Sequence, residues 1–171
     1  MDPITEDYLA CKGGDKDAMI RLYMSMKDIL LAIAMGIVND RGKSEDIVHD
    51  VFLQIMQSCD DQEVRNAKSY MIRMTRNRSI DYIRNDRRLL LVEENSGLLV
   101  QREVQRSSDD VSDLLNRLQQ EEAEVIRLRV VGELRYREIA AIMGITITKA
   151  FHLYRRGITK LRKQLKSDKR S

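Results

Sequence analysis

The chain has 171 residues, of which 43% are hydrophobic and 33% charged, and a net charge of +3. It holds two cysteines, which favours reduced thiols over a disulfide scaffold, and the absence of an apolar run of ~18 residues excludes a membrane-spanning helix. The acidic N-terminal sequence lacks the apolar segment of a secretory signal, so we expect a cytoplasmic protein without membrane insertion. One proline and eight glycines predict long helices and few strands.

The charges alternate along the chain. Residues 1–63 hold 6 basic and 13 acidic residues, and residues 89–148 hold 7 basic and 11 acidic ones. In contrast, residues 64–88 have 8 basic against 2 acidic residues, and residues 149–171 have 9 against 1. Concentrated basic segments are typical of phosphate binding. A solvated helix face is the alternative, and it explains one such segment more easily than two.

Three amphipathic helices are expected in the first half of the chain. The first is capped by Asp17 and extends toward Gly36 or Asn39, with apolar residues at helical spacing. The second begins after Ser44, a good N-cap, and carries a clean apolar stripe to residue 57. The third covers roughly 66–86. The polar sequence of 87–112 indicates a flexible linker, with a short helix near 98–105, and the LLLVEE stretch (89–94) is the best strand candidate.

The second half predicts four further helices, at 111–118, 120–131, about 136–143 and 147–166. Between the last two, Gly144 can end one helix in a left-handed conformation and Thr146 can cap the next. Two helices joined by such a turn form a helix-turn-helix, whose second helix lies in the DNA major groove. The packing positions are expected to include Ile147, Ala150, Phe151 and Tyr154, and the DNA candidates are Thr148, Lys149, His152, Arg155, Arg156 and Lys160. A helix pair inside an ordinary bundle is the alternative.

The helix at 66–86 mixes cationic with aromatic and amide side chains. Arginines bind phosphates, whereas tyrosine and asparagine suit unstacked bases. This mixture favours single-stranded or melting DNA over duplex alone, although Tyr70 and Tyr82 could equally pack at the edge of the core. The candidates are Tyr70, Arg73, Arg76, Asn77, Arg78, Tyr82, Arg84, Arg87 and Arg88.

At these residues the sequence resembles a known family. EDIVHDVFLQIMQ (45–57) followed by AKSYMIRMTRNRSIDYIRNDRR (67–88) resembles the conserved core of the extracytoplasmic-function (ECF) group of bacterial sigma-70 factors, and residues 118–149 resemble the second domain of that group. Two positions depart from the family pattern: Tyr70 stands where tryptophan is common, and Leu153 where an arginine is frequent.

The resemblance implies an all-α fold of two small helical domains joined by a flexible linker, the second a helix-turn-helix. Residues 1–88 would be region 2, 89–110 the linker and 111–171 region 4. Region 2 would bind the core RNA polymerase clamp through Asp46, Asp50 and Gln54. It would hold the opened minus-ten strand through Tyr70, Arg73, Arg76, Asn77, Arg78, Asp81, Arg84, Arg87 and Arg88. Region 4 would read the minus-thirty-five promoter element, and an anti-sigma factor is an implied partner.

We therefore expect a sigma factor that directs promoter-specific transcription by recognising and melting promoter DNA. The alternatives are a stand-alone helix-turn-helix transcriptional regulator and a helical interaction module. No phosphate-binding glycine loop, zinc-type ligand cluster or nucleophile–base pair is apparent, so we expect no catalytic residues, no metal site, no cofactor and no enzymatic activity.

Overall fold

The computed structural model describes residues 2–57, 64–96, 114–115 and 117–168. All elements in these ranges are helices, as predicted, and the chain divides into two compact units, Met1–Arg106 and Ser107–Ser171. The expected helices at 98–105 and, for the most part, 111–118 lie outside the described residues. None of the helices in the described ranges combines the length and the apolar character that a bilayer crossing requires.

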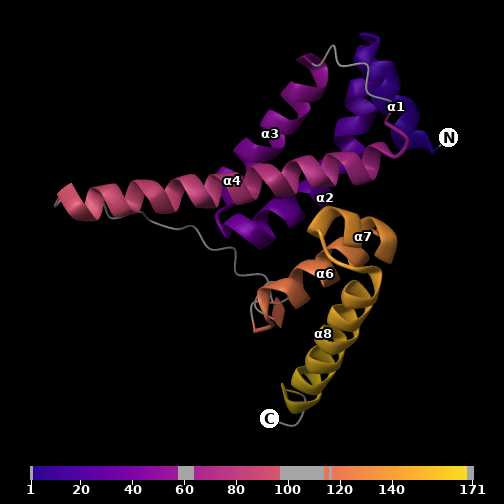
Figure 1. Cartoon of the computed structure of the whole chain (residues 1–171). Helices are drawn as coiled ribbons and strands as arrows, with labels where there is room; N and C mark the ends of the chain where they lie inside the picture. Colours follow the sequence, from indigo (N-terminus) through magenta and orange to yellow (C-terminus); the bar gives the residue numbers. More distant parts are fainter. Residues whose placement is uncertain (1, 58–63, 97–113, 116, 169–171) are drawn as a thin grey trace. The chain divides into compact units, whose positions relative to one another are not determined.

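The first unit consists of α1 (Pro3–Lys12), α2 (Lys16–Val38), α3 (Arg41–Gln57) and α4 (Ala67–Ser96) (Figure 1). Helix α2 packs against each of the other three. Its fully buried residues Leu22, Met26 and Leu30 recur every four positions and therefore form one stripe facing the core. Phe52 and Ile55 of α3 and Met71 of α4 are also buried in this unit.

Three expectations about these helices are wrong, and one helix was not foreseen. Helix α1 was not predicted, and α2 is capped by Asp15, whose carboxylate accepts the N–H groups of Asp17 and Ala18, rather than by Asp17. Ser44 is not an N-cap either. It lies inside α3, fully buried, and its hydroxyl donates to the carbonyl of Asp40 at 2.6 Å. Finally, 89–94 is not a strand.

Helix α4 continues through 89–94 to Ser96, so it ends ten residues beyond the expected position (Figure 1). Leucine and glutamate dominate this stretch, and both favour helix over strand when no neighbouring strand is present to pair with. Residues 89–96 of the expected linker are therefore helical. On α4 the residues Ala67, Met71, Ile72, Thr75 and Ser79 are fully buried, while Met74, Ile80 and Ile83 are half-buried, so two hydroxyl residues lie deeper than three apolar ones.

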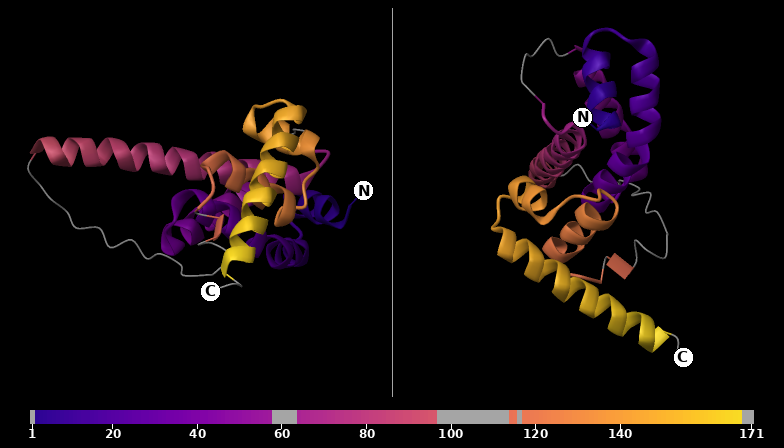
Figure 2. Two further views of the ribbon diagram at one scale, coloured as in Figure 1. Left: turned by 90° about the horizontal axis from the view of Figure 1, so that it is seen from below. Right: turned by 90° about the vertical axis from the view of Figure 1, so that its right-hand side faces the viewer.

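The second unit contains α6 (Gln120–Val130), α7 (Tyr136–Met143) and α8 (Ile147–Asp168), and Figure 2 shows α8 as one unbroken helix. Helix α8 packs against both α6 and α7. Gly157 permits the close approach to α6, because a Cβ at this position would lie 2.6 Å from Cδ1 of Ile126. The core beneath α8 includes Leu118, Ala123 and Ile126.

Candidate nucleic-acid and protein interfaces

The outer face of α3 is polar and acidic, as predicted. Asp46, Asp50 and Gln54 are all exposed, and their spacing of four residues places them on one side of the helix, opposite the buried stripe. Asp46 lies at the edge of a groove of about 430 Å³ between α2 and α3, whose lining also includes Lys27 and His49. This part of α3 therefore presents negative charge to a partner.

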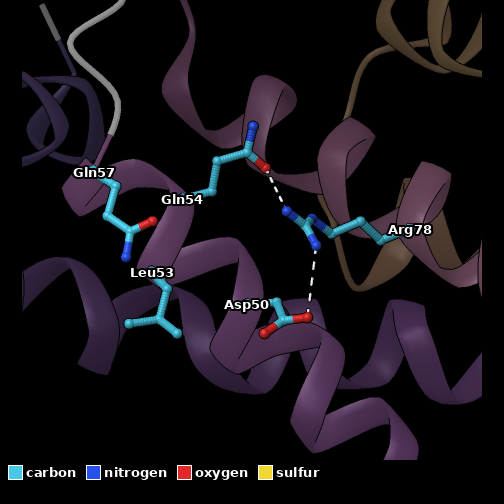
Figure 3. A pocket seen from close by; sticks show the side chains of 5 residues that line it. All are labelled: Asp50, Leu53, Gln54, Gln57 and Arg78. Atoms are coloured by element: carbon cyan, nitrogen blue, oxygen red, sulfur yellow. Dashed lines mark hydrogen bonds and ion pairs between the residues drawn. The ribbon is translucent and has the colours of Figure 1, made fainter.

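Asp50 and Gln54 line a separate hollow of about 340 Å³, and Arg78 of α4 reaches into it (Figure 3). The guanidinium of Arg78 donates to Oε1 of Gln54 at 2.7 Å and lies 3.6 Å from a carboxylate oxygen of Asp50. Residues predicted to bind polymerase thus contact a residue predicted to bind DNA. Arg78 is directed toward α3 and not outward with the other cations of α4.

The remaining candidates of α4 form a continuous exposed face. Its members are spaced three or four residues apart and are exposed: Arg73, Asn77, Asp81, Arg84 and Arg88, with Arg87 beside them. The arginines of 73–88 are thus neither dispersed nor covered, apart from the half-buried Arg76 and Arg78. Arg84 lies 3.8 Å from Asp81, an exposed pair that is worth little in stability.

The two tyrosines of α4 have different surroundings. Tyr70 is half-buried, with its ring edge-on to Tyr8 at 6.0 Å and the guanidinium of Arg73 5.7 Å from its centroid. Tyr82 packs against the buried cluster of Ala34, Val38 and Ile47. Both tyrosines therefore lie at the edge of the core, and Tyr70 is in addition adjacent to Arg73 of the cationic face.

The helix-turn-helix forms as predicted. Gly144 ends α7 with φ 66°, and the N–H of Ile145 donates to the carbonyl of Ala140 at 3.0 Å. The hydroxyl of Thr146 accepts the N–H of Lys149 at 3.1 Å and so caps α8. The turn fixes the first residues of α8 in position.

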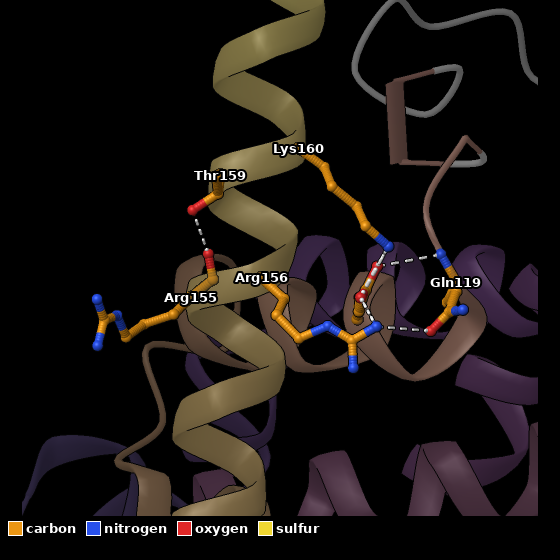
Figure 4. A network of polar contacts seen from close by, with 6 residues as sticks. Gln119, Arg155, Arg156, Thr159 and Lys160 are labelled. Atoms are coloured by element: carbon orange, nitrogen blue, oxygen red, sulfur yellow. Dashed lines mark hydrogen bonds and ion pairs between the residues drawn. The ribbon is translucent and has the colours of Figure 1, made fainter.

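Three of the six candidates on α8 form ion pairs with α6. Lys149 Nζ lies 3.1 Å from Glu121. Arg156 and Lys160 both reach the carboxylate of Glu122, at 3.2 and 2.7 Å, and this carboxylate is fully buried (Figure 4). Thr148, His152 and Arg155 are exposed without contacts to an acidic residue of α6. No local sequence pattern predicts the role of Glu122, because its partners lie 34 and 38 positions away.

The packing positions of α8 were only partly predicted. Ala150 is fully buried, but Ile147 and Phe151 are 53% and 41% exposed and are not core residues. Leu153, at the position where the family often has an arginine, is 5% exposed and belongs to the core. The inward face of α8 therefore runs through Ala150, Leu153 and Gly157, and Ile147 and Phe151 face outward.

Within the described residues no cluster of three or more His, Cys, Asp or Glu side chains could hold a metal ion. His49 is on α3 and His152 on α8, both exposed. Cys11 is buried, and burial raises the pKa of its thiol.

Both units of the chain match models of one protein family. Residues 22–89 match the model of sigma-70 region 2, and residues 108–161 match that of sigma-70 region 4. The chain gave no match among curated proteins. Among solved structures it is similar to CnrH in complex with the cytosolic domain of CnrY, with 21% identity and a TM-score of 0.70 over 98% of this chain and 99% of that one. It is also similar to the sigma factor RpoE in a co-crystal with the anti-sigma factor NepR from Bartonella quintana, with 25% identity and a TM-score of 0.69 over 90% and 99%.

The two family models describe successive regions of the same kind of protein, and together they cover most of α2 to α8. The region 2 match includes α3 and most of α4, which a stand-alone helix-turn-helix regulator would leave without a role, and nothing favours that alternative. Proteins of this family bind core RNA polymerase and promoter DNA and are not enzymes. The chain belongs to the sigma-70 family, within its extracytoplasmic-function group, and is a sigma factor that directs promoter-specific transcription.

Proposed function

We propose a division of labour among three surfaces of this sigma factor. The face of Asp46, Asp50 and Gln54 docks on the clamp coiled coil of core polymerase, and the exposed face of α4 holds the opened minus-ten strand. The N-terminal part of α8 reads the minus-thirty-five element. In this scheme residues 1–88 act as region 2, 89–110 as the linker and 111–171 as region 4.

One observation carries the proposal: the exposed face of α3 is acidic, whereas the exposed face of α4 is dominated by arginines, and Arg78 joins the two by its contacts with Asp50 and Gln54. Asp46 and Asp50 would repel phosphates, whereas Gln54 and the carboxylates can accept hydrogen bonds from a cationic protein surface. Arg73, Arg84 and Arg88 on α4 attract the strand's phosphates. Tyr70 offers an aromatic ring and Asn77 an amide for unpaired bases.

The second unit supports the third assignment by its geometry. The capped turn at Gly144 and Thr146 presents the first turns of α8, which is how a helix-turn-helix enters the major groove. Thr148, His152 and Arg155 are exposed there, and Lys149 lies beside them although it is paired with Glu121. Arg156 and Lys160 would contribute positive charge near phosphates while remaining bound to Glu122.

We further propose that the factor acts in the cytoplasm, where polymerase is present, and that an anti-sigma protein holds it inactive. Support for the second point is that RpoE, which is similar over 90% of this chain, was crystallised with the anti-sigma factor NepR. We also propose that the chain has no catalytic activity of its own.

Reconstituted transcription with core polymerase and a promoter library tests the whole scheme. A defined set of promoters should be transcribed only when the factor is present. If the folded factor gives no transcript, the proposal fails. Binding of duplex DNA without any association with polymerase would favour the stand-alone regulator instead.

The α3 assignment has its own variant. Asp50→Arg reverses the charge in the proposed polymerase surface and also places a cation next to Arg78, so we expect polymerase association to be lost while helicity is retained. Asp17→Arg is the control, because it reverses the charge of an exposed acid at the start of α2, outside the face of Asp46, Asp50 and Gln54. Undiminished association of Asp50→Arg would exclude this surface.

A further inference from the structure

The first two turns of α8 expose two apolar side chains where a DNA-reading helix usually carries polar ones. Ile147 is 53% exposed and Phe151 41% exposed, and a spacing of four residues places them on the same face. Thr148 and His152 flank them, also exposed. The buried residues nearest to them, Ala150 and Leu153, already provide the inward face, so the core does not require Ile147 and Phe151.

Phe151 is held in a defined position despite its exposure. Its ring meets the ring of Tyr136 edge-on, with centroids 5.5 Å apart, and the guanidinium of Arg155 lies 5.7 Å from its centroid. Contacts of this kind restrict an aromatic side chain to few orientations. Phe151 is therefore exposed but held in place, by Tyr136 of α7 on one side and by Arg155 on the other.

The electrostatics of α8 indicate what the exposed pair faces. No acidic residue occurs between Gly144 and Ser167, while lysines and arginines recur throughout that stretch. A helix of this charge attracts a polyanion. Arg155, which contacts Phe151, is exposed and suited to a phosphate. On the second helix of a helix-turn-helix, such an apolar pair can contact the base edges of the major groove while the neighbouring cations contact phosphates.

Within that groove, apolar side chains have one complementary group. Each base pair presents hydrogen-bond donors and acceptors, and thymine alone adds a methyl group, which apolar side chains such as phenylalanine contact. Guanine is most often read by arginine or lysine. In the first two turns of α8 no arginine occurs, and the one lysine, Lys149, is paired with Glu121 at 3.1 Å. The chemistry of this surface therefore favours thymine over guanine.

We propose that Ile147 and Phe151 are specificity-determining residues that contact thymine 5-methyl groups in the promoter duplex bound by α8. This inference rests on the proposed function of α8. It reassigns the two side chains from packing to readout, and it predicts that the upstream element contains thymine on at least one strand at the bases facing them.

The test removes the methyl groups without altering the protein. Holoenzyme is assembled from the full chain and core polymerase, and a promoter selected from the library is footprinted to locate the upstream protected element. Each thymine there is replaced by deoxyuridine, which lacks only the methyl group. Affinities are compared at one fixed salt concentration, because phosphate contacts make binding salt-dependent. At one or two thymines we expect binding to weaken about fourfold each, the value of one buried methyl-sized group.

Variants then locate the contact. Phe151→Ala should bind the thymine duplex more weakly and lose the difference between thymine and uracil at one position, and Ile147→Ala should do the same at a neighbouring position. Phe151→Leu, which keeps an apolar side chain and guards against a folding defect, should retain part of the difference. Arg162→Ala is the control, because Arg162 is an exposed cation of α8 three turns beyond Phe151. Any loss of affinity it causes should be the same for both duplexes, since a phosphate contact does not sense the base.

Each result decides the inference. If uracil and thymine duplexes bind the wild type equally at every position, it is wrong, while an intact upstream footprint leaves the proposed function of α8 standing. If Phe151→Ala and Ile147→Ala bind both duplexes like the wild type, the pair faces another partner, such as a protein, and the inference is again wrong. If holoenzyme gives no upstream footprint at all, the proposed function of α8 fails and the inference with it.

Discussion

Glu122 offers a quantitative test of how the second unit is held together. Its carboxylate is fully buried, whereas Arg156 and Lys160 remain 58% and 42% exposed at the side chain. Removing the acid and removing the bases should therefore have unequal costs. In Glu122→Gln both cations can turn into solvent, so the loss is that of two partly exposed pairs, about 1–2 kcal/mol.

Removing the two bases instead leaves the buried carboxylate of Glu122 without a counter-ion. In the double variant Arg156→Met with Lys160→Met, the carboxylate stays buried without a counter-ion, and we expect a loss of about 3–5 kcal/mol. Lys160→Met alone, which removes the partner at 2.7 Å, should fall between the two. In the Glu122→Gln background, Lys160→Met should cost less than about 0.5 kcal/mol, because residue 122 is then neutral and no buried charge loses its counter-ion.

Hydrogen exchange of α6 amides in the full chain measures these differences, since these amides report the opening of the second unit. Circular dichroism would verify that each variant is folded before the comparison. If Glu122→Gln destabilises α6 as much as the double methionine variant, the buried carboxylate does not dominate the cost and the reasoning is refuted.

Further predictions concern the first unit, the α4 face and the α6–α8 contact. Arg73→Ala and Arg84→Ala should each weaken binding of the opened minus-ten strand to holoenzyme by about 1–3 kcal/mol, whereas Arg41→Ala should not; equal affinities would mean that the face is misassigned. Thr5→Val should destabilise the first unit by about 1–3 kcal/mol in urea unfolding, because the buried threonine hydroxyl accepts the first N–H of α4 at 3.1 Å and valine leaves that N–H unpaired. Gly157→Ala should cost a net of about 1 kcal/mol, because the Cβ meets the terminal methyl of Ile126 at 2.6 Å while alanine regains part of that cost as helix propensity. An unchanged melting temperature would show that the Ile126 side chain moves aside freely.

Hydrophobic periodicity was sufficient to predict the helices that carry the surfaces. Leu22, Met26 and Leu30 of α2 are buried as their spacing indicates, and so are Val51 and Ile55 of α3. Periodicity failed where polar residues are buried. Thr75 and Ser79 face the core of α4 because their hydroxyls donate to the carbonyls four residues earlier, at 3.0 and 2.8 Å, which satisfies them locally.

The surfaces were predictable as lists of charges but not as arrangements. The arginines of α4 could be read from composition, whereas the contact of Arg78 with Gln54 joins residues 24 positions apart on different helices. The role of Glu122 and the exposure of Phe151 likewise depend on how α6, α7 and α8 pack. Such contacts arise from the packing of helices that are distant along the chain, and a single sequence holds no local pattern that predicts them.

The position of Arg78 has a consequence for how the two ligands of the first unit would influence each other. A polymerase group that takes over Asp50 and Gln54 must displace the guanidinium, which is then released to the strand-binding side of α4. Polymerase docking and strand binding would thus be thermodynamically linked. By reciprocity, DNA that binds Arg78 would raise the affinity of Asp50 and Gln54 for polymerase by the same factor. Since the Arg78–Asp50 pair is partly exposed, the coupling free energy would be at most about 1 kcal/mol. The factor would then bind the opened promoter strand severalfold more tightly in the holoenzyme than on its own.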